Sequence, residues 1–481
     1  MSRETTSRSR QWPRAALPRL RHALAGMLVL ALFGVGASAA SAATVRVVSK
    51  TKSGPNIYPT IQGAVNAAAP SDWVLIEPGV YEESVLVEKP GLHIRGMNRN
   101  TVILDGQNIV NAEGSNGIQV FKTNNVSIEN LTVRNFNRAE RDGGNGNEIW
   151  WNGGDGTGKI GAEGWHGAYL TAYDTGKFGG YGLFVSNSIK GTMEKVYASG
   201  FNDSGLYIGA CRDCQAKVTG ATVENSALGY SGTNSGGHLI IEKSIFRHNA
   251  AGLVPNSLAG DDEPPPQDGA CNSAQNTSET PKFESTDISR CTIFRQNQML
   301  ENNNLTTPAN STTAEAPWGV GVEMPGVYAD LVENNVIAGN ANNGVLGFEF
   351  PNGEPVPTFF QFSGNRISNN KFTGNGTSGK AFAGDVTLEG GMFNTPETGE
   401  SVNNCVSNNS FTAATFPGNI QGTWGCQHKT TPNPGTEPFG YVVELSAESR
   451  ALHTQEGQPA PGPQPTKPNP CDGVPKNALC K

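Results

Sequence analysis

Charge and long apolar runs are both scarce in this sequence. Charged residues make up 16% of its 481 residues. Beyond residue 42 no segment is apolar enough to cross a bilayer, which excludes a later membrane-spanning helix. Gly is abundant instead, at 60 of 481 residues or about 12%, against a usual ~7%. Asn is clustered, as in "ENNNL" (301–305). This composition favours turns and short strands over long helices.

Motifs that would name an enzyme class are also missing. The sequence contains no nucleophile elbow, no phosphate-binding loop and no pair of His at metal-ligand spacing. One CxxC occurs, at Cys211 and Cys214, and no second one completes a zinc ligand set. These absences count against assignment to an enzyme family by motif.

The first 42 residues have the composition of an export signal. Six Arg are followed by the apolar stretch "ALAGMLVLALFGVG" (23–36), which has the length of a signal-peptide core and is short for a membrane span. "ASAASA" (37–42) then supplies the small residues that a signal peptidase reads. We expect cleavage after Ala42 or Ala43, and an exported protein that is secreted or held in the cell envelope. The alternative is an N-terminal anchor helix.

Removal of this signal makes the chain strongly acidic. It leaves 29 Lys and Arg against 42 Asp and Glu, a net charge of −13. Such a surface is a poor partner for nucleic acid. It would also repel a polyanionic glycan unless a cation or a local basic patch intervened. We expect no nucleic-acid partner, no membrane span after cleavage, and a monomer.

The cysteines indicate disulfides. All eight follow the export signal, and an even number in an exported chain favours pairing. A redox or metal role for the CxxC pair is the alternative, but no second CxxC and no βαβ context support it. We expect sequence neighbours to pair, as Cys211–Cys214, Cys271–Cys291, Cys405–Cys426 and Cys471–Cys480.

Short segments of one pattern recur along the chain. "MEKVYASGF" from Met193, "VTGATVENS" from Val218 and "IEKSIFRHN" from Ile241 are spaced 25 and 23 residues apart. A period in the low twenties, built of short strands broken by Gly and Asn, predicts a solenoid with about three strands per turn. We assign further members of the repeat at Ile128, Ile288, Val332, Ile367 and Val406.

Two features fit a stack of such turns. Asn tolerates left-handed backbone angles, and a stacked row of Asn can hydrogen-bond along the stack. We interpret the Asn residues at one phase of the repeat as a structural ladder, namely Asn130, Asn334, Asn369 and Asn408. In addition, "YPTIQGAVNAAAP" (58–70) predicts a helix that covers the open end of the stack. Its apolar face consists of Ile61, Ala64, Val65 and Ala68.

The sequence resembles a known superfamily at this point. "PTIQGAVNAAAPSDWVLIEPGVYEESVLV" (59–87) and "LHIRGMNRNTVILDG" (92–106) resemble the opening of right-handed parallel β-helix proteins of the pectin-lyase-like superfamily. The resemblance covers roughly residues 44–425. It implies an all-β fold, a right-handed parallel β-helix (solenoid) with an N-terminal capping helix and long loop inserts.

The superfamily says less about chemistry. It includes polysaccharide lyases, glycoside hydrolases, uronan epimerases, esterases, phage adhesins and coils without known activity. The acidic quartet of uronan epimerases and the flanked Asp-Asp pair of polygalacturonases are absent here. We divide the chain into a signal peptide (1–42), a β-helix domain (43–426) and a Pro-rich tail (427–481). Within the tail we expect an extended linker (456–470) and a small disulfide-closed end.

A Gly-rich insert, residues 137–180, is a candidate wall for a binding site. Aromatic rings stack on sugar rings, so its aromatic residues could form a glycan platform, or they could anchor the loop to the coil. Those residues are Trp150, Trp151, Trp165, Tyr169 and Tyr173. Its polar candidates are Asp155, Glu163, His166, Asp174 and Lys177. As substrate-binding residues we select Trp165, His166, Tyr169 and, from the next turn, Tyr207.

The strands after this insert suggest catalytic candidates. Aligning "NDSGLYIGA", "ENSALGYSG" and "NAAGLVPNS" places Leu206, Leu228 and Leu253 in one inward row, with Tyr207 pointing outward. Paired carboxylates suit Ca²⁺ binding or glycoside cleavage, and a His suits proton transfer in a lyase or epimerase. The alternative is that such residues satisfy free backbone groups in turns. The residues near the edge of this face are Asp203, Glu224 and His248.

The sequence therefore predicts a secreted β-helix protein that binds an extracellular polysaccharide. It leaves open whether the protein also processes that polysaccharide, as a lyase, hydrolase or epimerase. The alternative is a non-catalytic surface or matrix-associated β-helix whose loops hold a partner. No cofactor is assigned, with Ca²⁺ as the candidate.

Overall fold

The structure of the chain is a computed structural model. It describes residues 43–110, 115–139, 145–154, 156–258, 290–308, 316–352, 358–389, 403–426 and 438–481. The chain from Ala43 to Lys481 forms one compact unit. The predicted signal peptide (1–42), Asp155, Cys271 and Ile288 lie outside the described residues.

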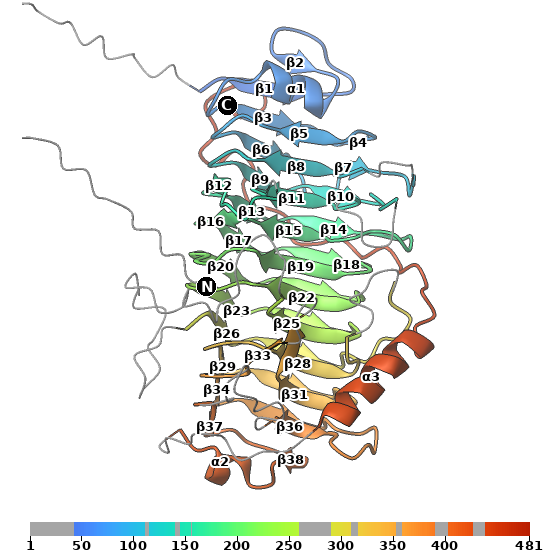
Figure 1. Ribbon diagram of the computed structural model, residues 1–481. Coiled ribbons are helices and arrows are strands. Elements are labelled where there is room, and N and C mark those ends of the chain that lie inside the picture. Colours follow the sequence, from blue (N-terminus) through green and yellow to red (C-terminus); the bar gives the residue numbers. More distant parts are fainter. Residues whose placement is uncertain are drawn as a thin grey trace, which may run out of the picture. The chain divides into compact units, whose positions relative to one another are not determined.

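The chain winds into a right-handed parallel β-helix, which confirms the predicted fold class (Figure 1). Each coil adds one short strand in turn to three parallel sheets, which we call sheets A, B and C. Sheet A contains β2 (Ile57–Tyr58), β1 (Val45–Val48), β3 (Trp73–Ile76), β6 (His93–Gly96), β9 (Ser127–Glu129), β13 (His166–Ala168), β17 (Thr192–Glu194), β20 (Ala216–Thr219), β23 (Leu239–Glu242), β26 (Thr292–Arg295), β29 (Leu331–Glu333), β34 (Arg366–Ser368) and β37 (Cys405–Ser407).

Sheets B and C are built in the same way as sheet A, from parallel strands of successive coils. Sheet B contains β4 (Gly79–Tyr81), β7 (Val102–Asp105), β10 (Thr132–Arg134), β14 (Thr171–Tyr173), β18 (Tyr197–Ser199), β21 (Thr222–Glu224), β24 (Ile245–Arg247), β27 (Gln298–Leu300), β30 (Val336–Ala338) and β35 (Lys371–Thr373). Sheet C contains β5 (Val85–Val87), β8 (Ile118–Phe121), β11 (Ile149–Asn152), β15 (Leu183–Ser186), β19 (Ser204–Gly209), β22 (Leu228–Thr233), β25 (Ala251–Asn256), β28 (Val320–Pro325), β31 (Asn343–Phe348), β36 (Gly384–Leu388) and β38 (Thr415–Phe416).

Few elements lie outside these sheets in the described part of the chain. Two small pairs are β12 (Ala162–Glu163) with β16 (Ser188–Ile189), and β32 (Phe350–Asn352) with β33 (Thr358–Phe360). The helices are α1 (Ile61–Ala67), α2 (Ile420–Thr423) and α3 (Phe439–Leu452).

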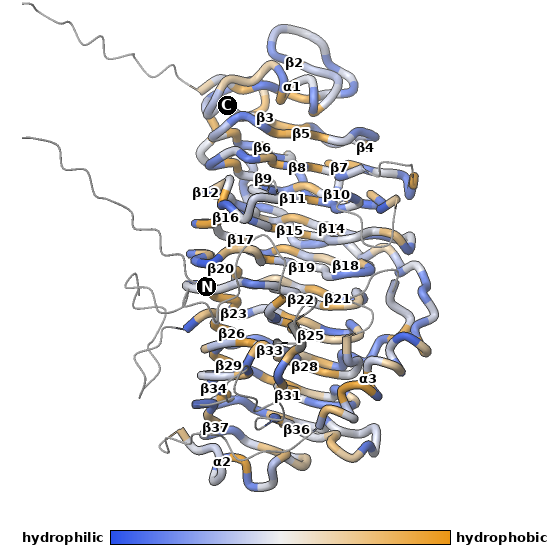
Figure 2. The backbone as a smooth tube through the Cα atoms, in the orientation of Figure 1, coloured by the Kyte–Doolittle hydropathy of each residue, from blue (hydrophilic) through white to orange (hydrophobic). Residues whose placement is uncertain are grey.

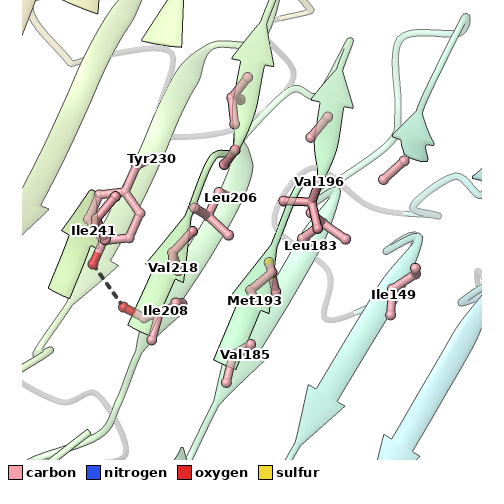
Figure 3. Close-up of a cluster of buried hydrophobic side chains, with 14 of the residues drawn as sticks. Ile149, Leu183, Val185, Met193, Val196, Leu206, Ile208, Val218, Tyr230 and Ile241 are labelled. Carbon is pink, nitrogen blue, oxygen red and sulfur yellow. Dashed lines mark hydrogen bonds between the residues drawn. The ribbon is translucent and has the colours of Figure 1, made fainter. Parts of the chain in front are cut away.

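Alternation along the strands builds the core. Hydrophobic and hydrophilic residues alternate along the strands in Figure 2, because successive side chains point to opposite faces of a sheet. In sheet C, Leu183 pairs with Leu206, and Leu206 with Tyr230, all pointing inward (Figure 3). The Tyr230 hydroxyl is satisfied inside the core because it donates to the Ile208 carbonyl at 3.1 Å. The predicted inward row was therefore wrong at Leu228, which lies two residues before its expected place and belongs to a separate small cluster.

The repeat is confirmed with two corrections. Met193, Val218 and Ile241 pair across neighbouring strands of sheet A at the predicted phase. The partner of Ile241 in the next coil is Phe294, not Ile288. The string "IFR" misleads here, because at 245–247 it forms a strand of sheet B and at 293–295 it belongs to sheet A. The insert 137–180 also contains a complete coil, β11 to β14, with Gly167 at the inward position.

At the corner between a sheet A strand and the sheet B strand that follows it, one residue adopts left-handed backbone angles. The four predicted ladder residues occupy this corner, with φ near +57°, between 55° and 58°. Three of them, Asn334, Asn369 and Asn408, are exposed, so they do not form the ladder. The ladder lies one residue later, where side chains turn inward. There the Asn335 amide donates to Asn370 Oδ1 at 3.0 Å, and the amide of Asn370 donates to Asn409 in the same way.

Both ends of the coil are covered. Helix α1 packs against β1, β3 and β5 through the predicted face, with Ile61, Ala64, Val65 and Ala68 all buried. The Thr60 side chain accepts from the N–H of Gly63 and so caps the helix. At the other end, buried Trp424 follows α2 and its carbonyl accepts from the N–H of Val406.

The C-terminal segment packs on the outside of the coil. Helix α3 contacts the outer face of sheet C, where Tyr441 and Leu445 meet Leu346. After α3 the chain runs back toward the first coils (Figure 1). The N–H of Thr454 donates to the Leu305 carbonyl at 3.0 Å. Near the other end of the run, the Thr466 hydroxyl donates to Asn130 Oδ1 at 2.7 Å. The Pro-rich stretch is thus extended and in contact with the coil along its path.

The disulfides follow the predicted neighbours where both partners are described. Cys211–Cys214, Cys405–Cys426 and Cys471–Cys480 are bonded. Cys291 is disulfide-bonded as well, and its predicted partner lies outside the described residues. The loop closed by Cys471 and Cys480 packs over Trp73 and Leu75 on the outer face of sheet A.

Candidate functional site

One column of side chains on the outer face of sheet C points away from the core. Pairing across β5, β8, β11, β15 and β19 fixes the column, because equivalent positions of stacked strands lie about 4.8 Å apart. Its members in these strands are Leu86, Gln119, Trp150, Phe184 and Tyr207. We call Trp150, Phe184 and Tyr207, together with Tyr181 just before β15, the aromatic column.

The rings of the aromatic column contact one another. The ring centroids of Trp150 and Phe184 lie 4.8 Å apart, with 10° between the planes. Tyr181 stacks on Phe184 at 4.3 Å. Tyr207 meets the ring of Phe184 edge-on at 4.8 Å and 87°. Since stacked and edge-on pairs hold each other in place, the column presents a fixed aromatic surface.

This column is open to solvent in its first coils. Leu86 is 42% exposed, Trp150 and Phe184 are partly exposed, and Tyr207 is 7% exposed. In the next coils, from Ser231 to Thr387, the same column is buried, and Leu346 is covered by α3. We call the column from Leu86 to Tyr207, four steps between coils or about 19 Å, the open half; Tyr207 is the nearly buried residue at its end.

A charged pair lies beside the aromatic column. Arg138 and Asp203 are both buried, with Nη2 and Oδ2 3.6 Å apart. The Arg138 guanidinium also lies 4.9 Å from the ring centroid of Tyr181. Burial, followed by the nearby charge of Asp203, raises the pKa of Tyr181 well above its usual value. The Tyr181 hydroxyl thus stays protonated and remains a hydrogen-bond donor next to a carboxylate.

Buried carboxyls position the loop that carries Tyr181. Asp174 accepts from the N–H groups of Gly176 and Gly179 at 2.8 and 2.6 Å. Burial raises the pKa of Asp174 to about 6 even though these hydrogen bonds lower it. Close packing continues at Gly180, where a Cβ would lie 2.1 Å from Arg138 Nε, so a larger residue would displace the Arg138 side chain.

The three predicted catalytic residues do not share a site. Asp203 lies beside the aromatic column, as described above. Glu224 ends β21 on the outer face of sheet B, where it accepts from the Tyr197 hydroxyl at 2.7 Å and from Arg247 Nε at 2.6 Å. His248 is an exposed corner residue with φ 54°, 3.7 Å from Glu301. Asp203 lies just before a sheet C strand, whereas Glu224 lies at the end of a sheet B strand and His248 at the corner that follows one. The sequence alignment did not distinguish these three positions.

The four predicted substrate-binding residues are also spread over the molecule. Tyr207 lies in the aromatic column. Trp165 is 2% exposed and packs on Trp151 in the core, so its ring is not available to a ligand. Tyr169 sits at the corner of sheets A and B, where Lys195 Nζ hydrogen-bonds its hydroxyl at 2.8 Å. His166 is on the outer face of sheet A, with Nδ1 2.8 Å from the Thr192 hydroxyl.

Sequence reasoning missed most of the aromatic column. Trp150 was noted in the insert but not selected, and Tyr181 and Phe184 were overlooked. The usable signal was strand alternation in "EIWWN" (148–152) and "GLFVS" (182–186), which turns Trp150 and Phe184 outward. Of the polar candidates, Glu163 forms an exposed ion pair with Lys190 at 2.7 Å.

Metal and membrane sites are not apparent in the described residues. Across them no group of three or more His, Cys, Asp and Glu side chains is placed to hold a metal ion, so the Ca²⁺ candidate has no assigned ligands there. Among the same residues no helix is both long and apolar enough to span a bilayer.

Comparison with known proteins finds similar solved structures and no match by sequence. No protein-family model matches the sequence, and no curated protein matches it. Among solved structures, the chain is similar to the A-module of the mannuronan C-5 epimerase AlgE6 of Azotobacter vinelandii, with 13% identity, 73% of this chain and 89% of that chain covered, and a TM-score of 0.45. It is also similar to the tailspike protein of E. coli bacteriophage HK620, with 10% identity, coverage of 70% and 55%, and a TM-score of 0.41. These likenesses concern the β-helix fold alone.

Proposed function

We propose that the protein is an exported β-helix protein that binds a polysaccharide along the open half of the sheet C column. The observation that carries this proposal is the row of contacting, partly exposed rings of Trp150, Phe184 and Tyr181. Ring faces bury the apolar faces of sugars, and a row along consecutive coils suits an extended chain of sugars.

Polar groups beside the rings support the same proposal. Gln119 is partly exposed in the column next to Trp150. The Trp150 indole N–H donates to the Ser186 hydroxyl at 3.0 Å, which fixes the ring. An apolar surface with a few oriented polar groups is the usual composition of a ligand site. The export signal and the disulfides favour an extracellular partner.

Processing of the bound glycan is a second candidate, and Asp203 favours it. Among the three predicted catalytic residues, Asp203 is the one beside the aromatic column, next to the Tyr181 hydroxyl and Arg138. A carboxylate held by a cation and a phenol is suited to accept or orient a proton. Asp203→Asn keeps the shape and removes the charge. We expect it to abolish any turnover, with glycan binding retained.

Binding is tested by removing one ring. Phe184→Ala should weaken binding of a glycan found on a panel of immobilised polysaccharides by at least tenfold, or about 1.4 kcal/mol. Phe178→Ala is the matched control, because Phe178 is 40% exposed and outside the column. Unfolding midpoints would show that both variants fold. If Phe184→Ala binds as tightly as the unmodified protein, the column is not the binding site.

A further inference from the structure

The open half of sheet C is free of charge. The five strands β5, β8, β11, β15 and β19 contain no Asp, Glu, Lys, Arg or His. The outer face of sheet A differs, since its strands in the same coils carry ion pairs such as Arg95 with Glu129. A low overall charge does not explain this difference, because both faces belong to the same coils.

Two of the cations near the column are already engaged within the described residues. Arg138 is buried, 3.6 Å from Asp203, and in contact with the Tyr181 ring. Its positive charge is matched by the Asp203 carboxylate, so the pair adds no net charge to the face. Lys122, which follows β8, is engaged in an interaction of its own.

The remaining described neighbours carry charge of both signs. Glu88, just after β5, is exposed. Lys177 is an exposed cation in the loop before Tyr181. With a net charge of −13 for the chain after signal removal, the field at this face repels polyanions.

We infer that the ligand of the aromatic column is a neutral glycan, an oligomer of uncharged sugars and not of uronates. The inference rests on the proposed function and adds the charge class of the ligand. Uncharged groups fill the outward positions beside the rings: the Gln119 amide is partly exposed, and the Asn152 amide and the Ser186 hydroxyl are nearly buried. These groups match sugar hydroxyls as donors and acceptors, whereas a carboxylate would lose hydration without gaining a cation.

The test compares neutral and anionic oligosaccharides of equal length. Cello-, xylo- and malto-oligosaccharides serve as neutral probes, and oligogalacturonate and oligomannuronate as anionic ones, in calorimetric titrations. We expect at least one neutral probe to bind with a dissociation constant that changes less than about twofold between about 0.01 M and 1 M salt. We expect at least tenfold weaker binding of both uronates at low salt, where repulsion is least screened.

Variants locate the binding and separate the outcomes. Phe184→Ala should remove binding of the neutral probe, and Lys177→Gln should leave it unchanged. Tighter binding of a uronate, weakened by salt or by Lys177→Gln, overturns the neutral assignment while leaving glycan binding at the column intact. Absence of binding to all the neutral and anionic probes overturns the proposed function itself, and the inference with it.

Discussion

Glu129 shows how one carboxylate connects distant parts of the chain. It is buried, and its Oε2 lies 2.7 Å from Arg95 Nε and 3.3 Å from Lys467 Nζ in the tail. Its Oε1 lies 3.5 Å from His166 Nε2. Burial raises the pKa of Glu129, but His166, Arg95 and Lys467 together outweigh burial and lower it to about 2. The charged form is therefore the one that stabilises the fold.

This lowered pKa predicts a pH-dependent contribution to stability. The folded pKa lies below the ordinary value of 4.5, so the contribution is complete above about pH 4.5 and is lost as the pH falls toward 2. Glu129→Gln should lower the free energy of unfolding by about 2–3 kcal/mol at pH 7. Denaturant titrations at several pH values should show the difference from the unmodified protein shrinking below pH 4.5.

The control for this change lies in the same column of sheet A. Glu194 occupies the outward position two coils further on, and it is exposed. Glu194→Gln should alter stability by less than about 0.5 kcal/mol. Equal effects of the two substitutions, or a Glu129→Gln effect that does not change with pH, would contradict this account.

Single residues also show why the sequence predicted the site only in part. Alternation correctly turned Tyr207 outward, because that rule needs only the local strand. Trp165 was selected as an aromatic residue of the Gly-rich insert, yet its ring fills the core beside Trp151. For two aromatic residues that are adjacent in sequence, such as Trp150 and Trp151, the register of the strand with its neighbours decides which one faces solvent. That register is set by contacts between coils.

At the scale of elements, the coil that contains β13 does not show the repeat pattern in its sequence, and the reason is steric. The inward position of β13 holds Gly167 where other coils have a large apolar residue. A Cβ at Gly167 would lie 3.0 Å from the ring of Trp151, so the Trp already fills the space. The apolar volume of this coil is thus supplied from sheet C, and the pattern in sheet A disappears.

The disulfide-closed end of the tail acts as a cover for the first coils. Trp73 and Leu75 point outward from sheet A, yet they are nearly buried because Val474, Leu479 and Cys480 pack over them. Covering such apolar surface stabilises by roughly 25 cal/mol per Å². The sequence predicted a small closed loop here, but its docking partner lies about 400 residues earlier and leaves no local signal.

Removal of residues 471–481 should expose that surface. We expect a lower melting temperature and one additional Trp accessible to a soluble quencher such as acrylamide. In a Trp73→Phe background the additional quenching should disappear, which identifies the exposed ring. A truncated chain with unchanged quenching and melting temperature would mean that the loop does not cover Trp73.

At the scale of the molecule, the period and the strand order could be predicted, and the path of the tail could not. Each coil contacts its neighbours, so its pattern recurs in sequence and can be counted. The tail has no period, and its contacts join coils far apart. Glu456 N–H donates to the Thr306 carbonyl at 3.2 Å, while a Cβ at Gly457 would lie only 2.3 Å from the Thr175 carbonyl. One or two tail residues thus bridge loops from two separate coils.

A duplicated coil tests whether the tail responds to coil number. Residues 216–238 form one coil without Cys between those two loops, and repeating them should move Thr175 and Thr306 about 4.8 Å further apart. The tail should then lose part of its contacts. Deleting residues 453–481 should therefore cost less stability in the duplicated chain than in the unmodified one. Unfolding midpoints of the four proteins give the coupling, and additive effects would contradict the expectation.

The loop that covers the first coils is synthesised after them, so these coils are uncovered for part of the time that synthesis takes. A ribosome makes Trp73 roughly 20–80 s before Cys480, at 5–20 residues per second, so the first coils form before their cover exists. Throughout that interval the apolar outer face of β3, which carries Trp73 and Leu75, remains exposed to solvent in the first coils of the growing β-helix. Nascent chains are thus prone to association throughout that interval, and the loop closed by Cys471 and Cys480 ends that risk when it docks.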